Sequence, residues 1–144
     1  MPKSKYWDNY YESLEQSDKN IPPSQFAAFC SLELIHSDIH QIVEIAAGEG
    51  RDSVFFANQG FHTIALDKST NALNLLRKRQ SSAKSLIALE TDAVNEGLPL
   101  PIFPKSLCAY YARFFLHTLE ENDLKKFFIN LSSSMKNKDL FFAE

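Results

Sequence analysis

A short apolar run that leads into a glycine-containing loop constrains the fold of this chain more than any other feature. Residues 41–47 include Val43 and Ile45, and the run is too short for a helix before it reaches Gly48 and Gly50. Such a run is typical of a strand buried in a parallel sheet. The two glycines allow positive φ and let a ligand approach the backbone closely. A helix that starts after the loop would also present free N–H groups to a ligand.

Strand-like and helical patterns alternate after this loop, which predicts an α/β fold with a mostly parallel sheet. Gly60 is suited to end the first helix, because glycine readily adopts the left-handed cap conformation. We expect strands over 41–47, 62–67, 85–90, 107–113 and 140–144, and helices over 51–59, 71–80 and 124–135. Thr118 and Glu121 have the spacing of a capping box for the last helix.

The length of 144 residues suits one domain with an N-terminal extension. Pro22 and Pro23 separate an aromatic segment, residues 1–23, from the predicted domain over residues 24–144. Ser24 is the expected N-cap of a helix that follows the prolines. Three further prolines within residues 97–105 predict a loop, because proline donates no backbone hydrogen bond.

Composition argues against several classes of partner. The formal charge is −3 and the basic residues are scattered, so we expect no nucleic acid partner. The basic run at residues 77–79 is best explained as the end of a helix, where cations complement the helix dipole. No apolar run approaches the ~20 residues needed to cross a bilayer, and no signal peptide is evident. We therefore expect a cytoplasmic protein without membrane contact.

Two cysteines, Cys30 and Cys108, are separated by 78 residues and form no CxxC motif. Neither lies in a pattern with histidines that would indicate a metal, so we expect no metal site. Cysteines of this kind are usually buried, reduced thiols.

Acidic residues occur at or near the ends of three consecutive predicted strands. Glu44 precedes the glycines, Asp67 lies nineteen positions after Gly48, and Asp92 follows 25 positions later. A carboxylate at the tip of the second strand can accept hydrogen bonds from the two hydroxyls of a ribose. Asp92 could accept from an exocyclic amine such as that of adenine. Each acid alone could instead cap a helix or turn, but the three together indicate a nucleoside site.

Two common nucleotide motifs are absent. A dinucleotide fingerprint that places its second glycine at Gly48 would need glycine at positions 46 and 51, where Ala46 and Arg51 stand. No GxxxxGK sequence followed by serine or threonine occurs, so a P-loop is excluded. An NAD-binding oxidoreductase is therefore the weakest of the three functions that we consider for this chain.

The sequence resembles the class I S-adenosylmethionine-dependent methyltransferases. The first motif of that family matches EIAAGEG at 44–50, the longer string GEGRDSVFFANQGFHTIALDKS covers 48–69, and YARFFLH at 111–117 is similar to the segment after the fourth strand. The resemblance implies a Rossmann-like three-layer sandwich with strand order 3-2-1-4-5 and helices on both faces. It also implies S-adenosylmethionine as cofactor, S-adenosylhomocysteine as product, and a small molecule as methyl acceptor.

The resemblance assigns a cofactor role to ten positions, from the methionine end to the adenine end and the methyl-transfer face. These are Glu44, Ala46, Ala47, Gly48, Gly50, Asp67, Lys68, Asp92, Ala93 and Ala112. Tyr6, Trp7 and Tyr11 would form a lid, although an aromatic strap packed on the core explains them equally well. Arg113 and His117 are the candidate catalytic residues, Arg113 for binding an acceptor anion and His117 as a base. Both could instead be structural.

The sequence departs from the family pattern in two places. Ala46 stands where the family usually has its first glycine, and the chain stops at Glu144, where the fold normally continues to two more strands. We expect the strand at 140–144 to be an exposed edge that could support homo-oligomers. Two functions therefore compete: a methyltransferase, and a catalytically silent cofactor-binding or oligomerising remnant.

Overall fold

A computed structural model describes residues 3–13, 21–80 and 85–144. Within them, five parallel strands form one sheet in the order β3-β2-β1-β4-β5. The α/β class, the Rossmann-like sheet and the predicted strand order are confirmed. Residues 14–20, part of the predicted N-terminal segment, lie outside the described residues.

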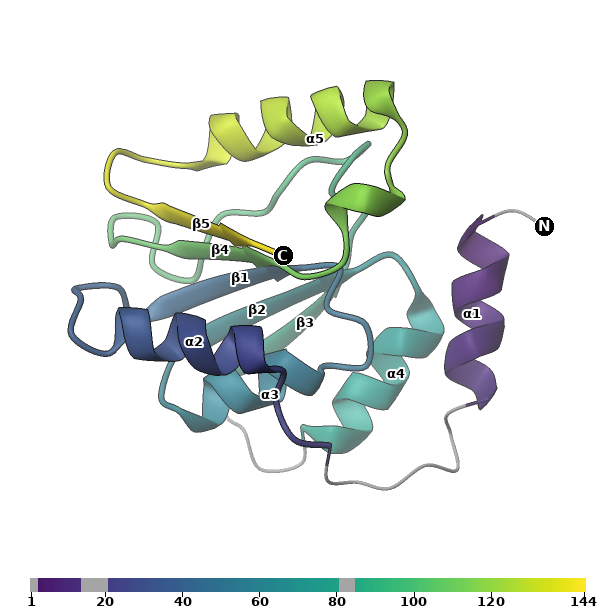
Figure 1. Cartoon of the computed structure of the whole chain (residues 1–144), viewed down its shortest axis with the longest axis horizontal. Helices are drawn as coiled ribbons and strands as arrows, with labels where there is room; N and C mark the ends of the chain where they lie inside the picture. The colour runs from purple at the N-terminus through teal and green to yellow at the C-terminus, as the bar shows by residue number, and fades with distance from the viewer. Residues whose placement is uncertain (1–2, 14–20, 81–84) are drawn as a thin grey trace.

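The elements follow one another as the sequence pattern indicated, with one additional helix at the N-terminus (Figure 1). They are α1 (Lys3–Ser13), α2 (Gln25–Leu34), β1 (Gln41–Ile45), α3 (Arg51–Asn58), β2 (His62–Asp67), α4 (Thr70–Arg79), β3 (Leu86–Glu90), β4 (Ala109–Ala112), the 3-10 helix η1 (Leu116–Thr118), α5 (Glu121–Ser134) and β5 (Leu140–Ala143).

Helices cover both faces of the sheet and make a three-layer sandwich (Figure 1). On one face, α5 packs on side chains of the sheet such as Val43 and Tyr110. Phe127 of α5 is fully buried in this core. On the other face, α2 and α3 pack on Ile42 and Tyr111. Alternate residues of β1 thus face opposite layers, as a strand requires. Both faces are apolar, which explains the nearly continuous apolar runs of β1 and β2.

Helix starts show where local sequence signals succeed and fail. Ser24 caps α2 as predicted, since its Oγ accepts a hydrogen bond from the Ala27 N–H at 3.0 Å. The predicted capping box at Thr118 and Glu121 is wrong. Thr118 belongs to η1 and its hydroxyl donates to the Phe115 carbonyl, so Glu120 becomes the N-cap of α5, without a side-chain cap bond.

The connection from β3 to β4, residues 91–108, contains no helix and must return from one edge of the sheet to the far side of β1. Buried Gln41, at the start of β1, holds it. Its Nε2 donates to the carbonyls of Phe103 and Leu107, and its Oε1 accepts from the Phe103 N–H at 2.9 Å. The prolines of this loop fit a segment whose hydrogen bonds come from a side chain rather than from a ladder.

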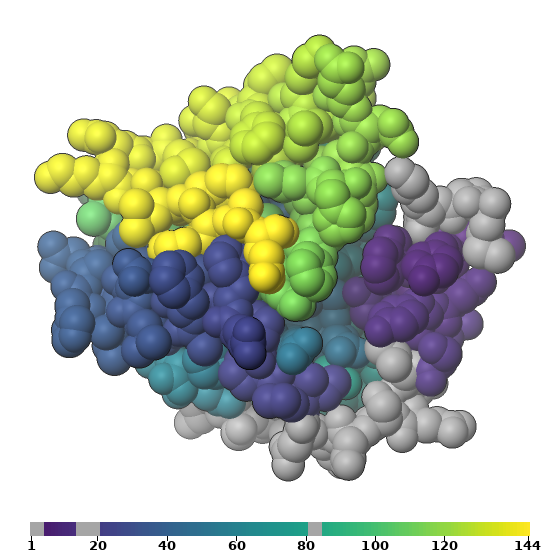
Figure 2. Space-filling model, in the orientation of Figure 1, coloured from purple at the N-terminus to yellow at the C-terminus, as the bar shows by residue number. Residues whose placement is uncertain are grey.

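One of the two edge strands of the sheet is β5, which pairs only with β4 in the described part of the chain. Figure 2 shows these C-terminal residues (yellow) at the surface beside α2 (dark blue). Cys30 and Cys108 are buried and unbonded, as predicted. Across the described ranges, no helix combines the length and the apolar character required to span a membrane.

Candidate functional site

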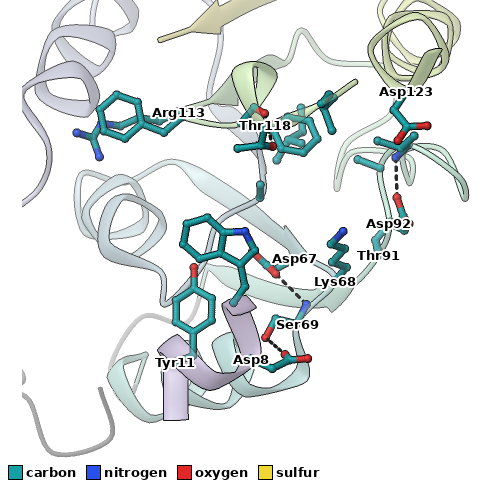
Figure 3. Close-up of a pocket in the computed structure, with 18 of the residues that line it drawn as sticks. Asp8, Tyr11, Asp67, Lys68, Ser69, Thr91, Asp92, Arg113, Thr118 and Asp123 are labelled. Atoms are coloured by element: carbon teal, nitrogen blue, oxygen red, sulfur yellow. Dashed lines mark hydrogen bonds between the residues drawn. The ribbon is translucent and has the colours of Figure 1, made fainter. Parts of the chain in front are cut away.

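A cavity of about 430 Å³ opens at the carboxyl ends of the strands, between the sheet and α1 (Figure 3). Its volume is in the usual range for small-ligand sites, ~300–1,000 Å³. It lies where strand order reverses beside β1, the usual ligand position in an open parallel sheet. The lining comes from α1, the ends of β1 to β4, η1 and the start of α5: Trp7, Asp8, Tyr11, Ile45, Ala46, Asp67, Lys68, Ser69, Thr91, Asp92, Ala93, Val94, Arg113, Phe114, Phe115, Thr118, Leu119, Glu120 and Asp123.

The loop after β1 has a strongly bent backbone. Ala46 has φ 56°, Gly48 has φ 59° and Gly50 has φ 80°, all in the left-handed region. Ala46 therefore carries a Cβ in a conformation that favours glycine. This bend also explains why β1 ends at Ile45 rather than at the predicted Ala47.

The two glycines serve different purposes. A Cβ added to Gly50 would lie 2.5 Å from Leu76 Cγ, so this glycine allows α3 to pack closely on α4. A Cβ added to Gly48 would lie 2.6 Å from the hydroxyl oxygen of Tyr11 on α1. Gly50 is thus a packing position, whereas Gly48 faces the N-terminal helix.

Asp67, at the tip of β2, lines the cavity and links the glycine loop to Ser69, the N-cap of α4. Its Oδ2 accepts from the Gly48 N–H and its Oδ1 from the Ser69 N–H, both at 2.8 Å. Burial raises the pKa of Asp67, although these hydrogen bonds oppose the shift. A carboxylate has about four lone-pair sites, so capacity remains for two ligand hydroxyls.

Asp92 and Ala93, after β3, also line the cavity. Asp92 accepts from the N–H groups of Val94 and Asn95 and from the Asn95 side chain at 2.9 Å. Partial burial disfavours the charge, but these hydrogen bonds outweigh it and lower the pKa of Asp92. Asp92 thus stabilises its own turn and, half-buried, lines the cavity. Lys68 lies between Asp67 and the Asp92 end (Figure 3).

Glu44 lies beneath the loop rather than in the cavity. Its side chain is buried against α3 and accepts a hydrogen bond from the Ser53 hydroxyl. Burial, reinforced by nearby Asp52, raises the pKa of Glu44 well above its ordinary value. Ala47 and Ala112 are likewise buried in the core and do not line the cavity.

The two candidate catalytic residues differ in position. Arg113 lines the cavity, but its Nε donates to Glu144 Oε2 at 2.8 Å and its guanidinium lies 3.9 Å from the Phe114 ring centroid. In Figure 3 this side chain points away from the acidic residues of the cavity. His117 is exposed on η1, outside the lining, with its ring 6.2 Å from that of Phe114.

The aromatic N-terminal segment is a helix at the mouth of the cavity. Trp7 and Tyr11 line the cavity and stack on each other, whereas Tyr6 is 56% exposed and does not reach it. Asp8 was not predicted, yet its Oδ1 accepts from the Ser69 hydroxyl at 2.5 Å. Asp123, on α5, is another acidic residue of the lining that sequence reasoning missed. Neither lies in a motif, and only the packing of α1 and α5 brings them here.

The structure thus brings together eight of the predicted positions around one cavity. They are Trp7, Tyr11, Ala46, Asp67, Lys68, Asp92, Ala93 and Arg113. The remaining predicted positions, Tyr6, Glu44, Ala47, Gly48, Gly50, Ala112 and His117, do not line it.

A parallel sheet with a bent glycine-containing loop after β1, and an acid at the tip of β2, defines a Rossmann-like domain of the class I S-adenosylmethionine-dependent type. The chain belongs to the methyltransferase domain family, whose model matches residues 42–138. No curated protein matches the sequence.

Solved methyltransferase structures share this fold. The glycopeptide N-methyltransferase MtfA complexed with sinefungin has 17% identity and a TM-score of 0.72, and the match covers 99% of this chain and 60% of that one. Phosphoethanolamine N-methyltransferase 1 of Haemonchus contortus, in complex with phosphoethanolamine and S-adenosylhomocysteine, has 15% identity, a TM-score of 0.73, and coverage of 97% and 31%. This chain therefore spans less than two thirds of either structure.

Proposed function

We propose that this chain binds S-adenosylmethionine and transfers its methyl group to a small molecule. The observation that carries the proposal is the position of Asp67, which lines the cavity at the tip of β2 while bonded to the glycine loop. Membership of the methyltransferase domain family supports it. Asp67 would hold the ribose, Asp92 and Ala93 the adenine, and the loop from Ala46 to Gly50 the methionine end.

The nucleoside half of the cofactor fits the residues present. Asp67 keeps accepting capacity inside a cavity of adequate volume, and no cation of the described residues is bonded to it. The methionine end fits less simply, because the open side of Gly48 faces the Tyr11 hydroxyl. That end needs Tyr11 to move.

S-Adenosylmethionine supplies an electrophilic methyl group, and the protein mainly has to align the acceptor and exclude water. Trp7, Phe114 and Phe115 would exclude water from the cavity that they line. Arg113 is our candidate for contacting an acceptor anion, which would compete with Glu144 for the guanidinium. His117 could act as a base only if η1 changed its position relative to the cavity.

The alternative function is a catalytically silent cofactor-binding protein. Two observations favour it: Tyr11 lies where a Cβ of Gly48 would stand, and both Glu44 and His117 lie outside the cavity lining. Methyl transfer to a panel of amines, phenols and thiols separates the two functions, since the silent protein would bind cofactor without product formation.

Cofactor binding is tested by a thermal-shift titration with S-adenosylhomocysteine. A ligand at 100 times its dissociation constant should add about 2.7 kcal/mol of stability. We expect Asp67→Ala to remove most of this shift, and Asp67→Asn, which keeps an accepting oxygen, to remove part of it. Asp38→Asn is the control, because Asp38 is exposed and outside the cavity. Wild-type protein without a shift at millimolar ligand would refute the proposal.

We also propose that two copies associate through the outer edge of β5. Leu140 is 42% exposed there, and Phe141 and Phe142 are only half-buried. Antiparallel pairing centred on Phe141 would place Leu140 of one copy opposite Phe142 of the other, so that apolar side chains meet. We further propose that the protein works in the cytoplasm, where its free thiols, Cys30 and Cys108, stay reduced.

A further inference from the structure

Tyr11 lies directly against Gly48. A methyl group added at Gly48 would stand 2.6 Å from Tyr11 Oη, 3.4 Å from Cζ and 3.7 Å from Cε1. These distances place the hydroxyl end of the ring on the side of Gly48 where a Cβ would stand. Gly48 consequently does not line the cavity, although its neighbour Ala46 and Tyr11 itself do.

Several contacts hold Tyr11 in this position. On its own helix, the ring of Tyr11 stacks on Trp7 at 6.2 Å and meets Tyr10 edge-on at 5.3 Å. The helix is tied to α4 and its N-cap: Asp8 accepts from Ser69 at 2.5 Å, and Glu12 accepts from Asn71 at 3.3 Å. Figure 1 shows α1 beside α4, at the end of the molecule where the strands finish. The helix thus docks on α4, and none of its described residues belongs to the apolar core clusters of the domain.

The environment of the Tyr11 hydroxyl is acidic. Burial, followed by the nearby carboxylate of Asp67, raises the pKa of Tyr11, so the phenol stays neutral. A neutral ring can pack beside Asp67 without an added charge. Tyr11 thus lies against the glycine loop, close to the carboxylate at the tip of β2.

We propose that Tyr11 is a specificity-determining residue that fills the amino-acid end of the cofactor cavity. The inference rests on the proposed function, in which the loop from Ala46 to Gly50 receives that end. A ligand with the amino-acid part must displace the ring from Gly48, and this cost lowers its affinity. An adenine thionucleoside without the amino-acid part needs only the Asp67 to Ala93 side of the cavity and leaves Tyr11 in place.

The test compares two ligands on the full chain by isothermal titration calorimetry: S-adenosylhomocysteine and 5′-methylthioadenosine. We expect Tyr11→Ala to tighten S-adenosylhomocysteine about tenfold and to leave 5′-methylthioadenosine within about twofold, since about 1.4 kcal/mol corresponds to a factor of ten. Tyr11→Phe, which removes only the atom nearest Gly48, should give a smaller gain in the same direction.

Tyr10→Ala is the matched control. Tyr10 is on the same helix, is 43% exposed and does not line the cavity, so neither affinity should change. If Tyr11→Ala weakens S-adenosylhomocysteine or leaves it unchanged while both ligands bind, this inference is wrong and the proposed function stands. If neither ligand binds wild type or any variant, the proposed function fails and the inference fails with it.

Discussion

At the scale of single residues, Ala46 departs from the family pattern, and this departure strains the backbone. The family pattern favours glycine here, and the structure confirms that the backbone adopts φ 56°, which glycine tolerates best. A Cβ in the left-handed region costs roughly 1–2 kcal/mol. The chain carries this strain at the point where β1 leads into the glycine loop.

We therefore expect Ala46→Gly to raise the free energy of unfolding by about 0.5–1 kcal/mol. Relief of strain should exceed the entropy that glycine adds to the unfolded chain, roughly 0.4–1 kcal/mol. Urea denaturation measures the change. Ala47→Gly is the control: Ala47 is buried, has no positive φ, and should lose about 1 kcal/mol. Equal losses in both variants would show that the bend at Ala46 is unstrained.

At the scale of elements, a buried carboxylate joins α2, α3 and β4. Asp52, on α3, accepts from the Ser24 N–H at 2.8 Å, from the Ser24 hydroxyl at 2.7 Å and from the Tyr111 hydroxyl at 2.7 Å. Its side chain is only 4% exposed. Because Ser24 also caps α2, the network sets how α2 sits on the sheet.

Removing the Asp52 carboxylate should lower the stability of the fold. We expect Asp52→Ala to lower the free energy of unfolding by about 3 kcal/mol, because it leaves several buried donors unsatisfied at roughly 1–3 kcal/mol each. Tyr111→Phe removes one donor with its bond and should cost about 1 kcal/mol. As control, Glu121→Ala breaks an exposed pair with Lys125 and should change stability by less than about 0.5 kcal/mol. Chemical denaturation ranks the three, and a loss below about 1 kcal/mol for Asp52→Ala would contradict the role.

Element prediction succeeded where apolar periodicity was strong. The boundaries of β2 matched the prediction, and those of α3 and α4 agreed within one residue. The helical state of α1 was not predicted, because the segment at 3–13 is polar and aromatic without a helical apolar stripe. The capping box at Thr118 does not form, because Thr118 belongs to a 3-10 turn. Its hydroxyl donates to the Phe115 carbonyl instead of capping α5.

At the scale of the whole molecule, the outward backbone groups of β5 can be identified. The N–H group of Leu140 donates to the Cys108 carbonyl just before β4 at 3.2 Å, and that of Glu144 donates to Ala112 of β4 at 3.1 Å. Backbone direction alternates along a strand, so the N–H groups of Phe141 and Ala143 point outward. These are the groups that a second copy would pair with.

Ala143→Pro should therefore weaken self-association at least tenfold while leaving the monomer folded. Proline removes an outward N–H without breaking a bond to β4, and proline is tolerated on edge strands. Ala143→Ser keeps the N–H and serves as control. Sedimentation equilibrium over a wide concentration range measures the association. Wild-type protein that is monomeric at every concentration would refute the dimer.

The alternation of strand-like and helical patterns was sufficient to predict the α/β class, and the strand order followed from the family resemblance that the glycine loop carries. The acids at positions 44, 67 and 92 predicted a nucleoside site, and two of them, Asp67 and Asp92, line the cavity. These features are local, because strand periodicity, positive φ and strand-end acids depend on residues close in sequence. Tertiary packing alone decided which of them face the cavity: it buried Glu44 on Ser53, set Gly50 against Leu76 and brought Tyr11 to Gly48. Contacts between residues tens of positions apart depend on how helices dock on the sheet, and no local pattern in the sequence encodes that docking.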